Sequence, residues 1–190
     1  MEPTSAPLAV PDSGVPDAIT PVLGHRLWEV RQDRLWPLWF AWLPWVPQQV
    51  SRATCHQPQG PFASALAGRP LPLHSAPDPS CSCGIYAAAA ADDLPSTWSG
   101  TKEVLVWGVV ALWGRVVIAE RGWRAQFAHP VSLTYQDLPG SGGKVAVSDG
   151  DWRRFHIAQA AHRYRLPVFD TGAEAWAHAP ELAWQAPEAR

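Results

Sequence analysis

Four residues that can bind a metal ion lie close together in the sequence. They are Cys55, His74, Cys81 and Cys83, and they include every cysteine of the chain. Zinc prefers four nitrogen or sulfur ligands in a tetrahedron, and a Cys₃His set supplies all four. Because such a set leaves no position for a water molecule, we expect a structural zinc ion rather than a catalytic one.

Three other interpretations of these residues are compatible with the sequence. His56 competes with His74 as the nitrogen ligand. One residue separates Cys81 from Cys83, a spacing less usual for zinc than CxxC and also suited to a redox-active pair. The third alternative is three unrelated buried cysteines. The zinc deaminase signature, H-x-E followed by P-C-x-x-C, does not occur, which again favours a structural role.

The ligands belong to a long irregular segment. Residues 56–80 contain eight prolines and glycines and show no apolar periodicity. A loop of this length inside a compact domain usually has a purpose, such as holding a metal ion at its ends. Since the loop cannot bury enough apolar surface to order itself, metal binding would supply that free energy. We therefore predict a zinc loop over residues 55–84.

The segments that must position this loop predict a mainly β protein. Four runs are rich in β-branched and aromatic residues and are separated by turn residues: 103–113, 116–120, 123–129 and 131–135. Gly114 and Arg115 predict a bend or bulge between the first two. Asp151 is a plausible N-cap for a helix over 152–164. The expected fold is α+β, mainly β: a small antiparallel barrel or bent sheet with a C-terminal helix packed on it.

Composition predicts one domain between two tails. Residues 1–22 are rich in Pro, Ser and Ala and should form a disordered arm. A single β-rich domain is expected over 23–168. Residues 169–190 are acidic and rich in Ala and Pro, so we expect a loose tail, in which Trp176 and Trp184 can dock back onto the domain.

Charge and hydropathy exclude several classes of protein. The net charge of −2 argues against a protein that coats nucleic acid through bulk charge. No apolar stretch is long enough for a transmembrane helix, and the N-terminus lacks the pattern of a secretory signal. An odd number of cysteines fits poorly with a disulfide framework. We expect a cytoplasmic protein with reduced thiols and no membrane partner.

Tryptophan is the most unusual feature of the composition, with 12 in the chain. Trp107, Trp113 and Trp123 fall on neighbouring expected strands together with Arg115 and Arg124. Aromatic rings and arginines on a β-surface suit stacking on bases, so we expect a non-enzymatic module that binds nucleic acid or a nucleotide-like ligand. The alternative is that the rings fill the barrel while the arginines point outward.

Two further functions are compatible with the sequence. The aromatic segment from Trp36 to Trp45 would be a contact surface if it were exposed, which describes a protein–protein adaptor. An enzyme would have to use Glu120, His129 or the Cys81–Cys83 pair.

Three segments together resemble a group of small, mostly actinobacterial proteins without an established activity. The segments are GHRLWEV from Gly24, HSAPDPSCSCGIYAA from His74, and VWGVVALWGRVVIAERGWRAQFAHP from Val106. This resemblance implies that His74, Cys81 and Cys83 act as one unit. The last segment is also similar to small PUA-like barrels, which bind RNA or modified bases, although a likeness of fold does not establish function.

Overall fold

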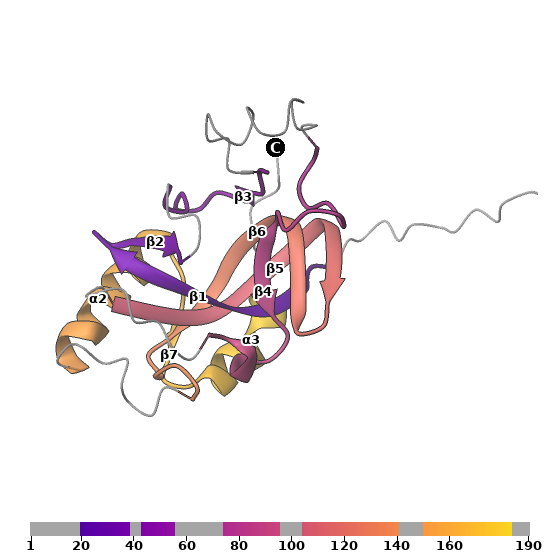
Figure 1. Cartoon of the computed structure of the whole chain (residues 1–190). Helices are drawn as coiled ribbons and strands as arrows, with labels where there is room; N and C mark the ends of the chain where they lie inside the picture. The colour runs from indigo at the N-terminus through magenta and orange to yellow at the C-terminus, as the bar shows by residue number, and fades with distance from the viewer. Residues whose placement is uncertain (1–19, 39–42, 56–73, 96–103, 141–149, 184–190) are drawn as a thin grey trace, which may run out of the picture.

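The computed structural model describes residues 20–38, 43–55, 74–95, 104–140 and 150–183 (Figure 1). Within these ranges the chain forms a seven-stranded sheet, two α-helices and a short 3₁₀ helix. The strands are β1 (Val22–Arg31), β2 (Arg34–Pro37), β3 (Ser51–Arg52), β4 (Ile85–Ala88), β5 (Val104–Ala119), β6 (Gly122–Thr134) and β7 (Val168–Phe169). The helices are η1 (Ala91–Asp93), α2 (Gly150–Tyr164) and α3 (Gly172–Ala183). The predicted fold class, α+β and mainly β, is confirmed.

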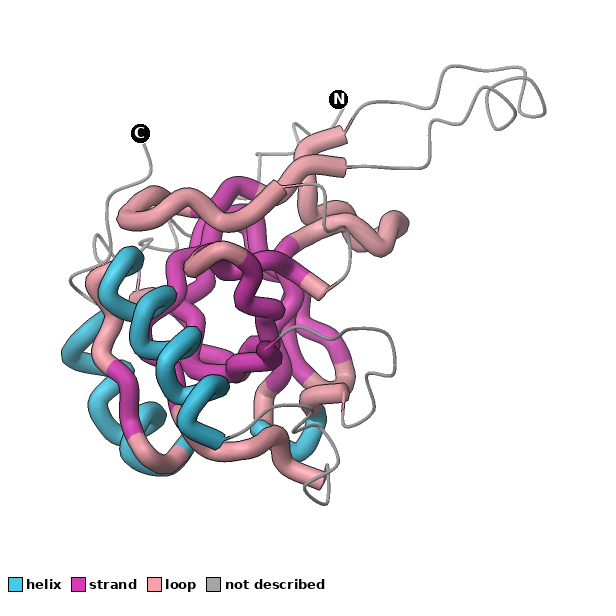
Figure 2. The backbone as a smooth tube through the Cα atoms, turned by 90° about the vertical axis from the view of Figure 1, so that its left-hand side faces the viewer, coloured by secondary structure: helices cyan, strands magenta, loops and turns pink. Residues whose placement is uncertain are grey.

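Strands β1, β5, β6 and β4 are connected in a ring. β1 pairs antiparallel with β5 along its length, with Leu27 opposite Trp107. β5 pairs with β6, and β6 pairs with β4 on its other edge. β4 then returns to β1, where His25 lies opposite Ala88. Figure 2 looks into this partly ring-like sheet, which matches the expected bent sheet or small barrel.

The long β5–β6 hairpin bends at the predicted bulge. The register between the two strands shifts between Trp113 and Val116. Gly114 lies in this shift with a φ of +74°, a conformation that favours glycine. A Cβ atom there would also lie 2.7 Å from the Phe127 ring. The bend therefore depends on glycine at this position.

Strands β3 and β4 follow one another along the same edge of β6. Arg52 of β3 lies opposite Phe127, and Ile85 of β4 lies opposite Ala125. Both strands are antiparallel to β6, so they run in the same direction, like one strand interrupted by residues 53–84. This interruption contains all four predicted metal ligands.

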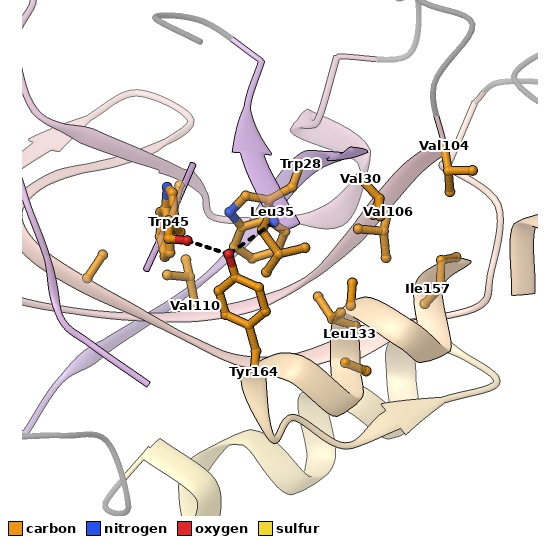
Figure 3. Close-up of a cluster of buried hydrophobic side chains, with 14 of the residues drawn as sticks. Trp28, Val30, Leu35, Trp45, Val104, Val106, Val110, Leu133, Ile157 and Tyr164 are labelled. Atoms are coloured by element: carbon orange, nitrogen blue, oxygen red, sulfur yellow. Dashed lines mark hydrogen bonds between the residues drawn. The ribbon is translucent and has the colours of Figure 1, made fainter. Parts of the chain in front are cut away.

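The main core lies between the sheet and helix α2 (Figure 3). It includes Trp28, Val106, Val110, Leu133 and Ile157, none more than 1% exposed. Fully burying one such apolar side chain contributes about 1.5–3 kcal/mol. Tyr164 of α2 also ties the helix to the sheet, because its hydroxyl accepts the Leu35 N–H at 3.1 Å and donates to the Trp45 carbonyl.

Helix α3 corrects the expectation of a loose tail from residue 169. Its small apolar side chains Ala175, Ala179 and Ala183 pack against a second cluster that includes Val109 and Val131 on the sheet. Trp176 docks back as expected and stacks on buried His25, with ring centroids 4.6 Å apart; Trp184 lies outside the described residues. Alanine is too small to give a strong apolar pattern, so this contact was not predicted from the sequence.

The start of α3 carries a helix signal in the sequence that was not among the predictions. The Glu174 N–H donates to the Thr171 hydroxyl at 3.2 Å, and the Thr171 N–H donates to the Glu174 carboxylate at 3.1 Å. This reciprocal capping box satisfies two backbone donors at the helix N-terminus.

No helix in the described part of the chain combines the length and apolarity that crossing a membrane requires.

Candidate metal centre

The four predicted ligands converge beside the β3–β4 edge of the sheet. Their ligand atoms, three Sγ and one imidazole nitrogen, all lie within 4.8 Å of one another. Cys55 Sγ is 3.8 Å from Cys81 Sγ, and His74 Nε2 is 3.3 Å from Cys83 Sγ. In a tetrahedral zinc site the ligand atoms are roughly 3.5–3.8 Å apart, given zinc–sulfur bonds of about 2.3 Å. The cluster could therefore hold a metal ion.

His74 is the histidine of this cluster among the described residues. The alternative, His56, lies outside them. The three cysteines form no disulfide, and each is half-buried. The short Cys81-Ser82-Cys83 spacing does not keep the two thiols apart, since both belong to the same group of ligand atoms.

Sheet pairing positions ligands from both ends of the interruption. Cys55 comes three residues after the end of β3, and the Ala53 N–H still donates to the Gln126 carbonyl at 2.7 Å. Cys83 comes two residues before Ile85 begins β4. Because β3 and β4 are both held by β6, the two ends of the loop meet at the cluster.

A turn at Asp78 directs the chain into the two neighbouring cysteines. The Asp78 carboxylate accepts the Ser80 N–H at 2.9 Å and the Ser80 hydroxyl at 2.5 Å. These bonds lower the pKa of Asp78, and they form the local ring with which aspartate stabilises a turn. The Cys81 N–H then donates to the Asp78 carbonyl at 3.1 Å. The position of Cys81 thus follows from local sequence.

Gly84 is required where the loop enters β4. Its φ is +130°, a backbone conformation that residues other than glycine rarely adopt. A Cβ atom there would lie 3.0 Å from the side chains of both Arg124 and Pro77. Glycine therefore lets the loop approach β6 closely, directly after the last ligand.

Arg124 of β6 holds the backbone of the ligand loop. Its Nη1 donates to the carbonyls of Cys81 and Cys83, the latter at 3.1 Å, and reaches the Asp78 carbonyl at 3.5 Å. The guanidinium also lies over the Tyr86 ring, 5.9 Å from its centroid. Arg124 was predicted to lie on a ligand-binding face, but this donor atom contacts the loop itself.

The thiols of Cys81 and Cys83 have opposite electrostatic environments. A hydrogen bond from the Cys83 backbone, the largest cause, lowers the pKa of Cys81 to about 7. Burial raises the pKa of Cys83. A metal ion binds the thiolate, so Cys81 is partly prepared for binding at neutral pH, whereas Cys83 would lose its proton on binding.

The aromatic residues expected on one ligand-binding face are divided among three clusters. Trp107 is 2% exposed, and its indole N–H donates to the Gln136 carbonyl at 2.9 Å. Trp123 packs against the main core, whereas Trp113 packs against the cluster under α3. Arg115 is exposed. These residues form no continuous face, because the two sides of the sheet take up different tryptophans.

The residues predicted for a protein–protein adaptor and for an enzyme also differ in how deeply they are buried. Trp45 is 7% exposed and belongs to the main core, whereas neighbouring Leu43 and Val46 are exposed. The segment from Trp36 to Trp45 is therefore not a continuous tryptophan surface in its described part. Glu120 is exposed beside the β5–β6 turn, while His129 is buried with its Nδ1 3.3 Å from the Gln49 carbonyl.

Comparison with known proteins gives no relative for this chain: no family model, no curated protein and no solved structure matches it. The resemblance to the actinobacterial group and to PUA-like barrels stays a prediction. The chemistry of the site is therefore inferred from its own geometry.

Proposed function

We propose that Cys55, His74, Cys81 and Cys83 bind one structural zinc ion in a non-enzymatic binding module. The observation that carries this proposal is the convergence of four ligand atoms within 4.8 Å. Four protein ligands complete a tetrahedron, so a water molecule or substrate has no coordination position. This distinguishes the site from a catalytic zinc centre.

The donor set favours zinc over the common hard cations. Magnesium and calcium select oxygen ligands, whereas three thiolates and an imidazole suit zinc. Thiolate ligands require reduced cysteines, so the proposal includes a reducing compartment such as the cytoplasm.

The ion would stabilise the ring at β4, where the contact with the neighbouring strand β1 is weakest. β4 has four residues and meets β1 at one paired position. A long segment separates it from β3, and closing that segment costs conformational entropy. A metal ion bound to Cys55 on one side and to Cys81 and Cys83 on the other would offset this cost.

Elemental analysis of the untagged, freshly reduced chain tests the proposal. We expect about one zinc per chain, and loss of that zinc in Cys83→Ser, because removing one thiolate opens a closed tetrahedral site. Ser82→Ala is the matched control, since Ser82 is exposed and lies between two ligands. A reduced wild-type protein without bound metal would contradict the proposal.

A second measurement separates metal loss from misfolding of the variant. Wild-type protein is titrated with a zinc chelator while hydrogen exchange is followed along β4 and β5. We expect the β4 amides to lose protection first, because the ion anchors that edge while buried side chains hold β5. Equal loss of protection in both strands would argue against local anchoring of β4 by the metal ion.

A smaller surface supports nucleic acid as a second candidate ligand. The half-buried rings of Trp113 and Phe127 lie 6.2 Å apart at 30°, and Arg52 lies over Phe127 at 5.9 Å. Arg52 and Arg115 are both exposed. Rings with adjacent arginines suit stacking on unpaired bases.

Oligonucleotide binding at several salt concentrations tests this second candidate. Arg115→Ala should weaken binding and reduce the slope of log affinity against log salt by about 1, as expected for one lost phosphate contact. Arg163→Ala, an exposed arginine on α2, is the matched control. Equal effects of the two substitutions would eliminate this surface as the binding site.

A further inference from the structure

Two of the contacts within the metal cluster join ligand atoms that are well separated in the sequence. His74 Nε2 lies next to Cys83 Sγ at 3.3 Å, and Cys55 Sγ lies next to Cys81 Sγ at 3.8 Å. Cys55 and Cys81 are 26 residues apart and come from opposite ends of the interruption between β3 and β4. A disulfide bond between Cys55 and Cys81 would join the two ends of this interruption, as the metal ion does.

We propose that Cys55 and Cys81 form a disulfide when a hydroperoxide oxidises the site, and that the zinc ion is released. This inference rests on the proposed zinc function. The site then has two closed forms, one metal-bound and reduced, the other metal-free and cross-linked. In both forms β3 and β4 stay joined beside β6.

The chemistry balances with hydrogen peroxide as the oxidant. One thiolate of the pair attacks a peroxide oxygen, which breaks the O–O bond and gives a sulfenic acid and hydroxide. The second thiolate attacks that sulfur, forming the S–S bond and releasing a second hydroxide. Two protons from solvent convert the hydroxides to water. The two thiols lose two electrons and the peroxide gains them, while zinc leaves with its charge unchanged.

Partner choice within the cluster follows from the positions of the thiols. A disulfide requires its sulfur atoms to approach to about 2.05 Å from compatible backbone positions. Arg124 Nη1 holds the carbonyls of both Cys81 and Cys83, so the backbone between these two is fixed. Cys55 comes from the other end of the interruption, three residues after β3, and not from the backbone that Arg124 holds. All three thiols are half-buried, which leaves a small peroxide access to them.

Peroxide titration of the zinc-loaded full chain tests the proposal. Zinc release is followed with a chromogenic chelator, and the remaining thiols are alkylated. Cleavage on the N-terminal side of Asp78 separates Cys55 from the other two cysteines. We expect one cross-linked peptide pair carrying one alkylated cysteine, which fragmentation places at Cys83, and release of the bound zinc in step with cross-linking.

Two variants distinguish the pair from its alternatives. Cys83→Ser should still form the Cys55–Cys81 cross-link with peroxide, whereas Cys81→Ser should lose it. Mapping of wild-type protein supplies the same information if a variant does not fold. A predominant Cys81–Cys83 bond, or zinc release with sulfinic acid and no cross-link, would overturn the inference.

The outcome is separable from the proposed function. Absence of zinc from the reduced protein contradicts the structural zinc site, whatever peroxide does. Zinc present at one per chain, but released without the Cys55–Cys81 bond, contradicts this inference alone. Restored zinc binding after treatment with a thiol reductant would further support a reversible pair.

Discussion

The face of the sheet under α3 and the edge formed by β3 and β4 are held in different ways. Under α3, the buried side chains of Ala175 and Ala179 pack against Val109 and Val131. At the edge, the chain is rich in Pro, Gly and Ser, and the Cys–His cluster and Arg124 make the contacts. This difference indicates that a segment with few large apolar side chains needs polar or metal contacts to join a β-sheet.

The largest effect should come from the core shared by both regions. Trp28→Ala removes a fully buried ring and should lower the free energy of unfolding by about 3–5 kcal/mol. Denaturant unfolding measures the change. Trp152→Ala is the matched control, because Trp152 is 45% exposed. Similar losses for the two variants would contradict the assignment of Trp28 to the core.

The apolar region can be disturbed separately at the start of α3. A Cβ atom at Gly172 would lie 2.0 Å from the Trp107 ring. Gly172→Ala should therefore cost about 1–3 kcal/mol of stability through overpacking, with zinc content unchanged. Gly150→Ala at the start of α2 meets nothing within 4 Å and serves as the control. Loss of zinc in Gly172→Ala would show that the two regions are coupled.

The polar region can be disturbed without touching a ligand. Arg124→Met removes the donor to the Cys81 and Cys83 carbonyls and should weaken zinc affinity about 10–100-fold, the usual effect of residues that orient metal ligands. Competition with a chelator of known affinity measures it. Arg121→Met, an exposed arginine three residues away, should have no such effect. Unchanged affinity in Arg124→Met would remove Arg124 from the site.

The smallest effect concerns pH and the contact between His25 and Trp176. Burial lowers the pKa of His25, so folding favours the neutral ring. The resulting stability is complete above the unfolded value near 6.5 and is lost as pH falls from there through the folded pKa. We expect His25→Phe to flatten the acid side of the stability curve measured by denaturant unfolding.

A surface substitution separates this effect from the titration of other groups. His162→Gln, at an exposed position on α2, is the control for His25→Phe. Both variants are compared with wild type at each pH, so that proton binding by the metal ligands cancels. An acid slope in His25→Phe equal to that of wild type would contradict the assignment.

Local patterns in the sequence were sufficient for some parts of this fold. The β-branched runs predicted β5 and β6, and Gly114 predicted the bulge. Helix α2 was predicted from residue 152 with Asp151 as its N-cap, but it begins at Gly150, so Asp151 lies in its first turn. These features depend on nearby residues. Helix α3 was missed, since its contacts use alanine, although Thr171 and Glu174 carried a readable capping signal.

The sequence by itself determined the chemistry available at the site: three thiols, a histidine and a Pro-rich segment between them. Tertiary structure decided which other residues serve the site. Register places Arg124 opposite Tyr86, and so beside the ligand loop, while Trp107 is buried against Gly172 at the start of α3. Long-range pairing fixes both outcomes, because the face on which a strand residue lies depends on its partner strands and on the elements that pack on them.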